Sequence, residues 1–241
     1  MKGIIPAAGR GTRLEPITLA IPKELLMVGD KAIIEYVIDA MKQINVTNIT
    51  IVVGWRKNAI LDYLGSGERL GVNLTYVVQD KRDGLAKAVY AGKYINHDEP
   101  FLVVLGDNFF YPKTFLKDIS EFHKNKNADA TIGVTEIEDP TRHGIIKTGE
   151  DNKIIDLVEK PNKADAPSKL GCIGIYIFNS EIFKAIEKTK PGVNNEYQLT
   201  DAIKILVEQN KKVYYKEIKG THIDIGTPSD LKKANSFLLK H

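Results

Sequence analysis

The segment Phe101-Leu102-Val103-Val104-Leu105-Gly106-Asp107-Asn108 predicts a buried strand that ends at an acidic residue. Its first five residues are all apolar, a pattern typical of a strand covered on both faces, as in a parallel sheet. In open sheets of this kind ligands bind beyond the carboxyl ends of the strands, which is where Asp107 stands. The segment therefore predicts an α/β fold and a first candidate site residue.

Strand-like and helical patterns alternate on both sides of this segment. Strands are expected from Ile4 and over residues 48–53, 72–78, 101–105, 145–147, 154–158, 172–178 and 213–218, and helices over 34–41, 58–64, 85–95 and 197–209. Residues 149–152 read as a hairpin turn, residues 7–23 as a long loop, and Thr227 as the cap of a last helix with Pro228 at its first position. The alternation predicts a mixed, mostly parallel sheet with helices on both faces, in three layers.

Composition narrows the class of protein. The 241 residues are 43% hydrophobic and 27% charged, which suits one globular domain spanning residues 1–241. A net charge of +3 is too mild for a nucleic-acid binder. The single cysteine, Cys172, excludes an intramolecular disulfide and fits a reducing compartment.

The sequence gives no sign of a membrane or export segment. The apolar run at the N-terminus is too short for a signal peptide, and no stretch approaches the roughly 20 apolar residues that cross a bilayer. We therefore expect a cytoplasmic protein without a membrane partner. If the protein forms an oligomer, we expect a symmetric homo-oligomer, because most soluble oligomers are of this kind.

The loop Ala7-Ala8-Gly9-Arg10-Gly11-Thr12-Arg13-Leu14 follows the first expected strand and has the properties of a phosphate cradle. A loop at a strand end can aim N–H groups at phosphate oxygens, glycines let the backbone approach closely, and an arginine offers a fork of donors. Leu14 breaks the three-glycine dinucleotide spacing, and no Gly-Lys-Ser/Thr follows, so two familiar phosphate loops are excluded. A flexible glycine turn remains the simpler alternative.

Together with residues 16–26, which include Pro22-Lys23-Glu24-Leu25, this loop resembles the signature of sugar-1-phosphate nucleotidylyltransferases. The resemblance extends from Lys2 to the final helix and implies a Rossmann-like, glycosyltransferase-A-like fold. It implies a nucleotide-binding N-terminal half, a sugar-phosphate-binding C-terminal half and no C-terminal β-helix domain. It gives Arg13 and Lys23 catalytic roles on the triphosphate, and assigns nucleotide contacts to Ala8, Gly9, Gly11, Thr12, Arg13 and Asp107.

The resemblance also implies a magnesium site. Leu105-Gly106-Asp107-Asn108 and Asp224-Ile225-Gly226-Thr227 are similar to the two metal-binding elements of the family, so Asp107 and Asp224 are the expected ligands of Mg²⁺. Magnesium prefers one or two carboxylates completed by phosphates and water. The simpler alternative for either residue is a turn or cap.

Further matches concern the base and the sugar phosphate. Gln79 and Gly84 resemble the family's pyrimidine-reading elements, and the family's sugar-phosphate contacts fall on Gly144, Glu159, Lys160, Gly174 and Glu196. Two positions depart from the pattern: Asn194 stands where many thymidylyl members have an arginine that helps to hold the sugar phosphate, and His143 replaces a tyrosine.

The expected reaction joins dTTP or UTP to glucose 1-phosphate, or a related sugar 1-phosphate, and releases diphosphate. Some motifs look thymidylyl-like and others uridylyl-like, so both nucleotides stay open. A sugar-nucleotide-dependent glycosyltransferase is one alternative, although it would favour Asp-x-Asp where this chain has Asp107-Asn108-Phe109. A non-catalytic nucleotide-sensing protein, or a nucleotidylyltransferase acting on a non-sugar phosphate, are the others.

Overall fold

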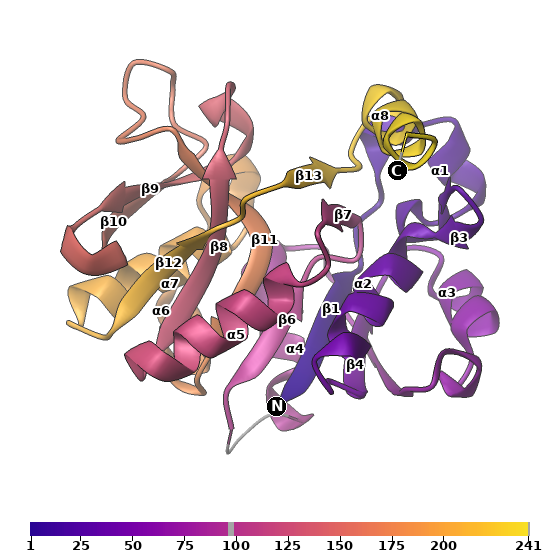
Figure 1. Ribbon diagram of the computed structural model, residues 1–241, viewed down its shortest axis with the longest axis horizontal. Helices are drawn as coiled ribbons and strands as arrows, with labels where there is room; N and C mark the ends of the chain where they lie inside the picture. The colour runs from indigo at the N-terminus through magenta and orange to yellow at the C-terminus, as the bar shows by residue number, and fades with distance from the viewer. Residues whose placement is uncertain (96–98, 241) are drawn as a thin grey trace.

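The computed structural model describes residues 1–95 and 99–240, and its main feature is one mixed sheet (Figure 1). In this part of the chain the sheet has nine strands, with the order β10-β9-β11-β6-β1-β4-β5, while β8 pairs with β11 and β12. The N-terminal half supplies the parallel strands β1 (Lys2–Ala7), β4 (Asn48–Val53), β5 (Asn73–Val78) and β6 (Phe101–Val104). The expected mixed sheet with parallel central strands is confirmed.

The C-terminal half extends the sheet with mainly antiparallel pairs. It contains β8 (Ala130–Glu136), β9 (Gly144–Thr148), β10 (Ile154–Glu159), β11 (Leu170–Phe178) and β12 (Val213–Glu217). β9 and β10 form the expected hairpin, β11 pairs antiparallel with β6, β8 and β9, and β12 is parallel to β8. β11 therefore joins the two halves of the sheet.

Helices cover both faces, which confirms the three layers. α2 (Ile33–Gln43), α3 (Lys57–Leu64) and α5 (Phe115–Lys126) pack on one face, and α4 (Leu85–Ala91), α6 (Glu181–Lys188) and α7 (Leu199–Glu208) on the other. Successive strand residues point to opposite faces, so Ile5 joins the first core and Ile4 the second. Figure 1 shows α2 and α5 in front of the sheet and α4 behind it.

A third, smaller core, which includes Leu14, Ile33 and Ala234, fixes the C-terminal segment against the N-terminal half. The chain runs from β12 through β13 (Thr221–Asp224) to α8 (Pro228–Leu238), crossing from one half of the molecule to the other (Figure 1). On the way, β13 pairs antiparallel with β7 (Asn108–Tyr111). As predicted, Thr227 caps α8, accepting a hydrogen bond from the Asp230 amide at 3.3 Å, with Pro228 at the first position.

Two expected elements differ in detail. The predicted loop over residues 7–23 contains short helical turns, Thr12–Leu14 and α1 (Ile17–Ala20), because the segment must bury Leu14 and Thr18 beneath it. The helix expected over residues 85–95 is α4 followed by a separate 3-10 turn, Lys93–Ile95. Gly92 separates the two, packed so closely on Ile4 that a Cβ atom would lie 2.6 Å from its Cδ1. Within the described ranges, no helix is both long and apolar enough to span a bilayer.

One buried histidine predicts how stability depends on pH. Burial lowers the pKa of His123 in α5 to about 4, against a weaker opposite effect of Asp129, and its Nδ1 lies 2.8 Å from Oγ1 of Thr131. The unfolded chain takes up this proton near pH 6.5 and the folded chain only near pH 4, so stability falls as pH drops through that window. We expect the loss to be about 1–3 kcal/mol and to shrink in His123→Gln. Melting temperatures of both proteins from pH 7 to pH 4 test this; identical slopes would contradict it.

Candidate active site

Two adjacent cavities open at the carboxyl end of the parallel strands. The first, of about 290 Å³, is lined mainly by the N-terminal half, and the second, of about 210 Å³, mainly by the C-terminal half. Leu85, Leu105 and Glu196 line both, so the two cavities share a wall. Among the predicted residues, the first cavity collects Ala8, Gly9, Lys23, Gln79, Gly84, Asp107 and Glu196, and the second Gly144, Glu159, Lys160, Gly174, Glu196 and Asp224.

The glycine loop lies against the side chain of Lys23. A Cβ atom at Gly9 would sit 3.5 Å from Cε of Lys23, and one at Gly11 3.3 Å from its Cβ. Gly11 and Thr12 form the turn into the short helix that carries Arg13, and the Gly11 carbonyl accepts a hydrogen bond from Oγ1 of Thr18 at 2.8 Å. The turn thereby fixes the position of Arg13, whose guanidinium packs so closely on Gly226 that a Cβ there would lie 2.6 Å from Nη2.

Lys23 is a half-buried cation among carboxylates. Its Nζ forms an ion pair with Oδ2 of Asp107. Burial by itself would lower the pKa of Lys23, but the charges of Asp107, Glu24 and Asp224 outweigh it and raise the pKa, so the amine stays protonated. This places one positive charge at the floor of the first cavity.

The pairing of β7 with β13 brings the two predicted metal ligands together. Asp224 is directly opposite Asn108, and the Ile225 amide donates a hydrogen bond to the Asp107 carbonyl at 3.1 Å. Burial and the charge of Asp107 raise the pKa of Asp224 to about 6, while Lys23, Arg13 and Arg142 act in the opposite direction. Asp224 therefore lies close enough to Asp107 and to these cations for their charges to change its pKa.

The donor set suits magnesium. Asp107 lines the first cavity, Asp224 lines the adjacent second cavity, and the charge of Asp107 acts on Asp224. A magnesium ion held by Asp107 and Asp224 would complete its coordination with substrate phosphates and water, as this ion commonly does.

Gln79 and Gly84 form one wall of the first cavity. Nε2 of Gln79 donates to Oδ1 of Asp83 at 3.1 Å and to the Gly84 carbonyl at 3.3 Å, which fixes the orientation of the amide. Gly84 has a φ of 118° and lies against the backbone of Tyr197, whose carbonyl oxygen would be 2.4 Å from an added Cβ. The close contact between this wall and Tyr197 is therefore possible only because glycine has no side chain.

This contact leads to a prediction for Gly84→Ala. Because the clash is with backbone atoms, we expect the free energy of unfolding to fall by about 2–5 kcal/mol, from overpacking plus strain at positive φ. Gly65→Ala is the matched control: Gly65 also has a positive φ, 55°, but an added Cβ there would meet nothing within 4 Å, so about 1 kcal/mol is expected. Equal losses in urea denaturation of the two variants would show that the Tyr197 contact is unimportant.

A cluster of arginines surrounds Trp55 and includes Arg82, which lines the first cavity. Trp55 is held by a hydrogen bond from Nε1 to the Thr18 carbonyl at 3.1 Å. The guanidinium carbons of Arg10, Arg56 and Arg82 lie 5.2, 5.5 and 6.0 Å from the centre of its ring system, and Arg82 also lines the cavity. Such a concentration of cations raises the local concentration of anionic ligands.

The second cavity contains an acid held by its own neighbours. Oε2 of Glu159 accepts a short hydrogen bond from Oγ1 of Thr200, and Oε1 lies 3.4 Å from Nζ of Lys160. A Cβ atom at Gly144 would lie 3.0 Å from Oε2 of Glu159, so the glycine leaves the space that this carboxylate fills. Glu159 is thereby fixed in one orientation.

Gly174 lies in an irregularity of β11. Pairing with β8 shifts register between Cys172 and Tyr176, and Gly174 has a φ of 70° within this bulge. Its carbonyl accepts the Leu105 amide at 3.0 Å, while Nδ2 of Asn108 donates to the Ile173 carbonyl at 2.7 Å. The bulge therefore locks the segment that carries Asp107 onto β11.

The sequence interpretation missed several lining residues. In the first cavity these include Glu24, which is buried in the structure. The sequence signal that could have been used is an acid next to Lys23 in a mostly apolar stretch. Burial raises the pKa of Glu24 to about 7, partly offset by Lys23. In the second they include Arg142, Thr200 and His222, which the sequence does not single out.

The chain belongs to the nucleotidyl transferase family, whose model matches residues 2–241. It is 34% identical to the low-salt glycan biosynthesis nucleotidyltransferase Agl11 of Haloferax volcanii, over all of this chain and 66% of that protein. It is 34% identical to a UTP–glucose-1-phosphate uridylyltransferase of Staphylococcus epidermidis, over 93% of this chain and 87% of the relative. The resemblance read from the sequence motifs is confirmed.

A solved structure of UDP-glucose pyrophosphorylase in complex with UDP-glucose superimposes with a TM-score of 0.92 and 32% identity, covering 99% of this chain and 98% of that one. This confirms the fold class. Other relatives are much longer: the chain spans 56% of the bifunctional protein GlmU of Methanococcus vannielii.

Proposed function

We propose that this chain catalyses the reaction of a pyrimidine nucleoside triphosphate, UTP in the first place and dTTP as the alternative, with glucose 1-phosphate, releasing diphosphate and a nucleotide sugar. The observation that carries the proposal is the proximity of three charged residues: Lys23 and Asp107 form an ion pair in the first cavity, and their charges act on Asp224, which lines the second. One relative is a UTP–glucose-1-phosphate uridylyltransferase, and the superimposed pyrophosphorylase is in complex with UDP-glucose. Both similarities support UTP as the nucleotide.

In this proposal the first cavity holds the nucleotide. Gln79 and Gly84 face the edge of the pyrimidine, and Ala8, Gly9, Gly11 and Thr12 lie along the phosphates with their backbone amides. Arg13 and Lys23 bind the triphosphate and neutralise the departing diphosphate. Fixed cations of this kind stabilise charge without reorganising during the reaction.

The second cavity would hold the sugar 1-phosphate. Glu159 and Glu196 accept hydrogen bonds from sugar hydroxyl groups, Gly144 and Gly174 let the backbone approach the ring, and Lys160 offsets the phosphate charge. Because the two cavities share a wall, substrates bound in them would lie side by side, which supports a reaction between them.

The reaction would be a direct displacement at the α-phosphorus. A phosphate oxygen of the sugar 1-phosphate forms the new bond to this phosphorus, and the bond to the oxygen that bridges to the β-phosphate breaks. The attacking oxygen is already anionic at neutral pH, so no general base is needed. Magnesium held by Asp107 and Asp224 would supply charge neutralisation at the α-phosphate. The chain's own residues position the two anions in line.

Diphosphate release from a matrix of substrates tests the proposal. UTP, dTTP, CTP, ATP and GTP are each combined with glucose 1-phosphate, galactose 1-phosphate, mannose 1-phosphate and N-acetylglucosamine 1-phosphate, in the presence of Mg²⁺. We expect the highest kcat/KM for UTP or dTTP with glucose 1-phosphate. No release with any pair would refute the proposal, and sugar transfer from a nucleotide sugar instead would favour the glycosyltransferase alternative.

A further inference from the structure

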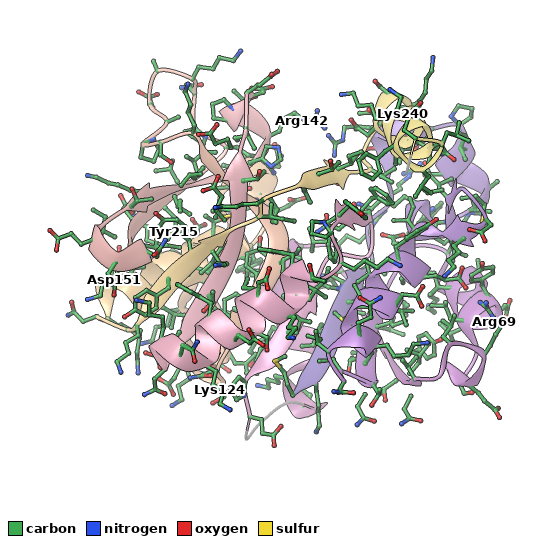
Figure 2. All side chains as sticks on the ribbon, in the orientation of Figure 1. Arg69, Lys124, Arg142, Asp151, Tyr215 and Lys240 are labelled. Atoms are coloured by element: carbon green, nitrogen blue, oxygen red, sulfur yellow. The ribbon has the colours of Figure 1, made fainter. Side chains whose placement is uncertain are left out.

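Two cations stand at the open end of the β9–β10 hairpin. The last paired residues of the ladder are Gly144 and Glu159, and the Lys160 amide donates a hydrogen bond to the His143 carbonyl at 2.9 Å. Arg142 therefore precedes this end of the ladder, and Lys160 follows it. Both side chains line the second cavity, and in the view of Figure 2 Arg142 lies above β13, toward α8.

The local structure fixes the backbone at Arg142. It is the last residue of the 3-10 turn Pro140–Arg142, which Asp139 caps by accepting hydrogen bonds from the amide and hydroxyl of Thr141 at 3.3 and 2.8 Å. The His143 amide then donates to the Pro140 carbonyl at 3.2 Å. The turn ends at the rim of the cavity, so the arginine is presented to the ligand space by a well-bonded loop.

More acidic side chains than permanently charged basic ones line the second cavity. Its described lining includes the acids Glu159, Glu196 and Asp224, but only two cations with permanent charge, Arg142 and Lys160. Lys160 is paired with Glu159. Arg142 has no ion pair in the part of the chain that the structure describes, and its side chain is exposed at the rim. Its charge acts on Asp224 and on His143, so it lies near Asp224, one of the two proposed metal ligands.

We propose that Arg142 binds the phosphate group of the sugar 1-phosphate and is the main determinant of affinity for this substrate. The inference rests on the proposed function. A sugar phosphate carries nearly two negative charges at neutral pH, and a guanidinium can donate two parallel hydrogen bonds to it. Lys160, whose charge is shared with Glu159, is the secondary contact. Asn194, the position at which the sequence pattern lacked an arginine, lies in an exposed 3-10 turn, Val193–Asn195, and needs no role in this account.

The test is the KM of each substrate for Arg142→Gln, Arg142→Lys and wild type at saturating Mg²⁺. We expect Arg142→Gln to raise the KM for glucose 1-phosphate by about tenfold or more, the typical effect of losing a charge-assisted pair, with less than a twofold change in the KM for UTP. Arg142→Lys should recover part of the loss, because it restores the charge without the fork of donors. Lys147→Gln, on the exposed part of β9, removes one positive charge outside the cavity and should leave both KM values unchanged.

A purely positioning role for Arg142, through Asp224, predicts a different result. It would lower kcat or raise the Mg²⁺ requirement while leaving the KM for glucose 1-phosphate as in wild type, and that outcome would overturn the proposal. Calorimetric titration of glucose 1-phosphate into protein saturated with an α,β-methylene analogue of UTP gives a second readout without turnover. If Arg142→Gln bound glucose 1-phosphate as tightly as wild type in this titration, the proposal would also be overturned. These outcomes can be distinguished from failure of the proposed function, because in that case wild type would release no diphosphate in any substrate combination.

Discussion

Asp107→Asn should lower kcat by about 100- to 1,000-fold while leaving the protein folded. Asparagine has the same shape, and its amide oxygen can still accept a hydrogen bond from Lys23, so the buried contact is retained in weaker form. What disappears is the negative charge that would help to hold magnesium next to the α-phosphate. The measurement is diphosphate release at saturating substrates and Mg²⁺, with melting temperature as the check on folding.

The same variant has a readout that does not depend on activity. Burial is the largest cause of the raised pKa of Asp224 and the charge of Asp107 is the second, so Asp107→Asn should lower that pKa from about 6. Titration of the Asp224 carboxyl by NMR measures it. Asp62→Asn, an exposed substitution on α3, is the control and should change neither quantity. A near-native kcat in Asp107→Asn would remove Asp107 from the mechanism.

Lys23→Met should affect both catalysis and stability. We expect kcat to fall by about 100- to 1,000-fold, because the cation that neutralises the departing diphosphate is lost. We also expect the free energy of unfolding at pH 8 to fall by about 3–5 kcal/mol, because removing one partner leaves Asp107 as an uncompensated buried charge. Lys57→Met, at an exposed position of α3, should change neither kcat nor the free energy of unfolding.

The pH dependence of this loss has a definite sign. Lys23 lowers the pKa of Glu24, which burial raises to about 7 from an ordinary 4.5, so Lys23→Met should raise it further. Glu24 then binds a proton in the folded state at pH values where the unfolded chain has released it, and stability decreases as pH rises through that window. The variant should therefore be closest to wild type near pH 5 and furthest from it at pH 8. A deficit that does not change with pH would contradict this explanation.

Much of the sheet could be predicted because its strands are short apolar runs. Residues 101–105 are such a run, residues 48–53 are apolar apart from Asn48 and Thr50, and both segments form central strands. α5, β8 and α6 were not identified in the sequence. The pairing of β7 with β13 could not be predicted at all, since it joins residues more than a hundred positions apart and depends on the path of the chain between the two halves.

The candidate site was predictable to a similar extent. Motifs with glycine, proline and charged residues in fixed order pointed to Lys23, Asp107 and Asp224, and the structure brings all three together. Arg142 could not be singled out, because an isolated arginine after a turn is ordinary in any surface loop. Its place at the same end of the β9–β10 hairpin as Lys160 comes from the register of that hairpin, which the sequence leaves open.

Whether Asp107 and Asp224 hold one metal ion together is tested by measuring the binding of Mn²⁺, as a substitute for Mg²⁺, by electron paramagnetic resonance in the presence of the α,β-methylene analogue of UTP. If Asp107 and Asp224 share one ion, wild type should bind a single tight Mn²⁺ per chain, and Asp107→Asn and Asp224→Asn should each weaken that same ion about tenfold or more. Unchanged Mn²⁺ affinity in Asp224→Asn, or two ions of which each variant loses a different one, would contradict the account.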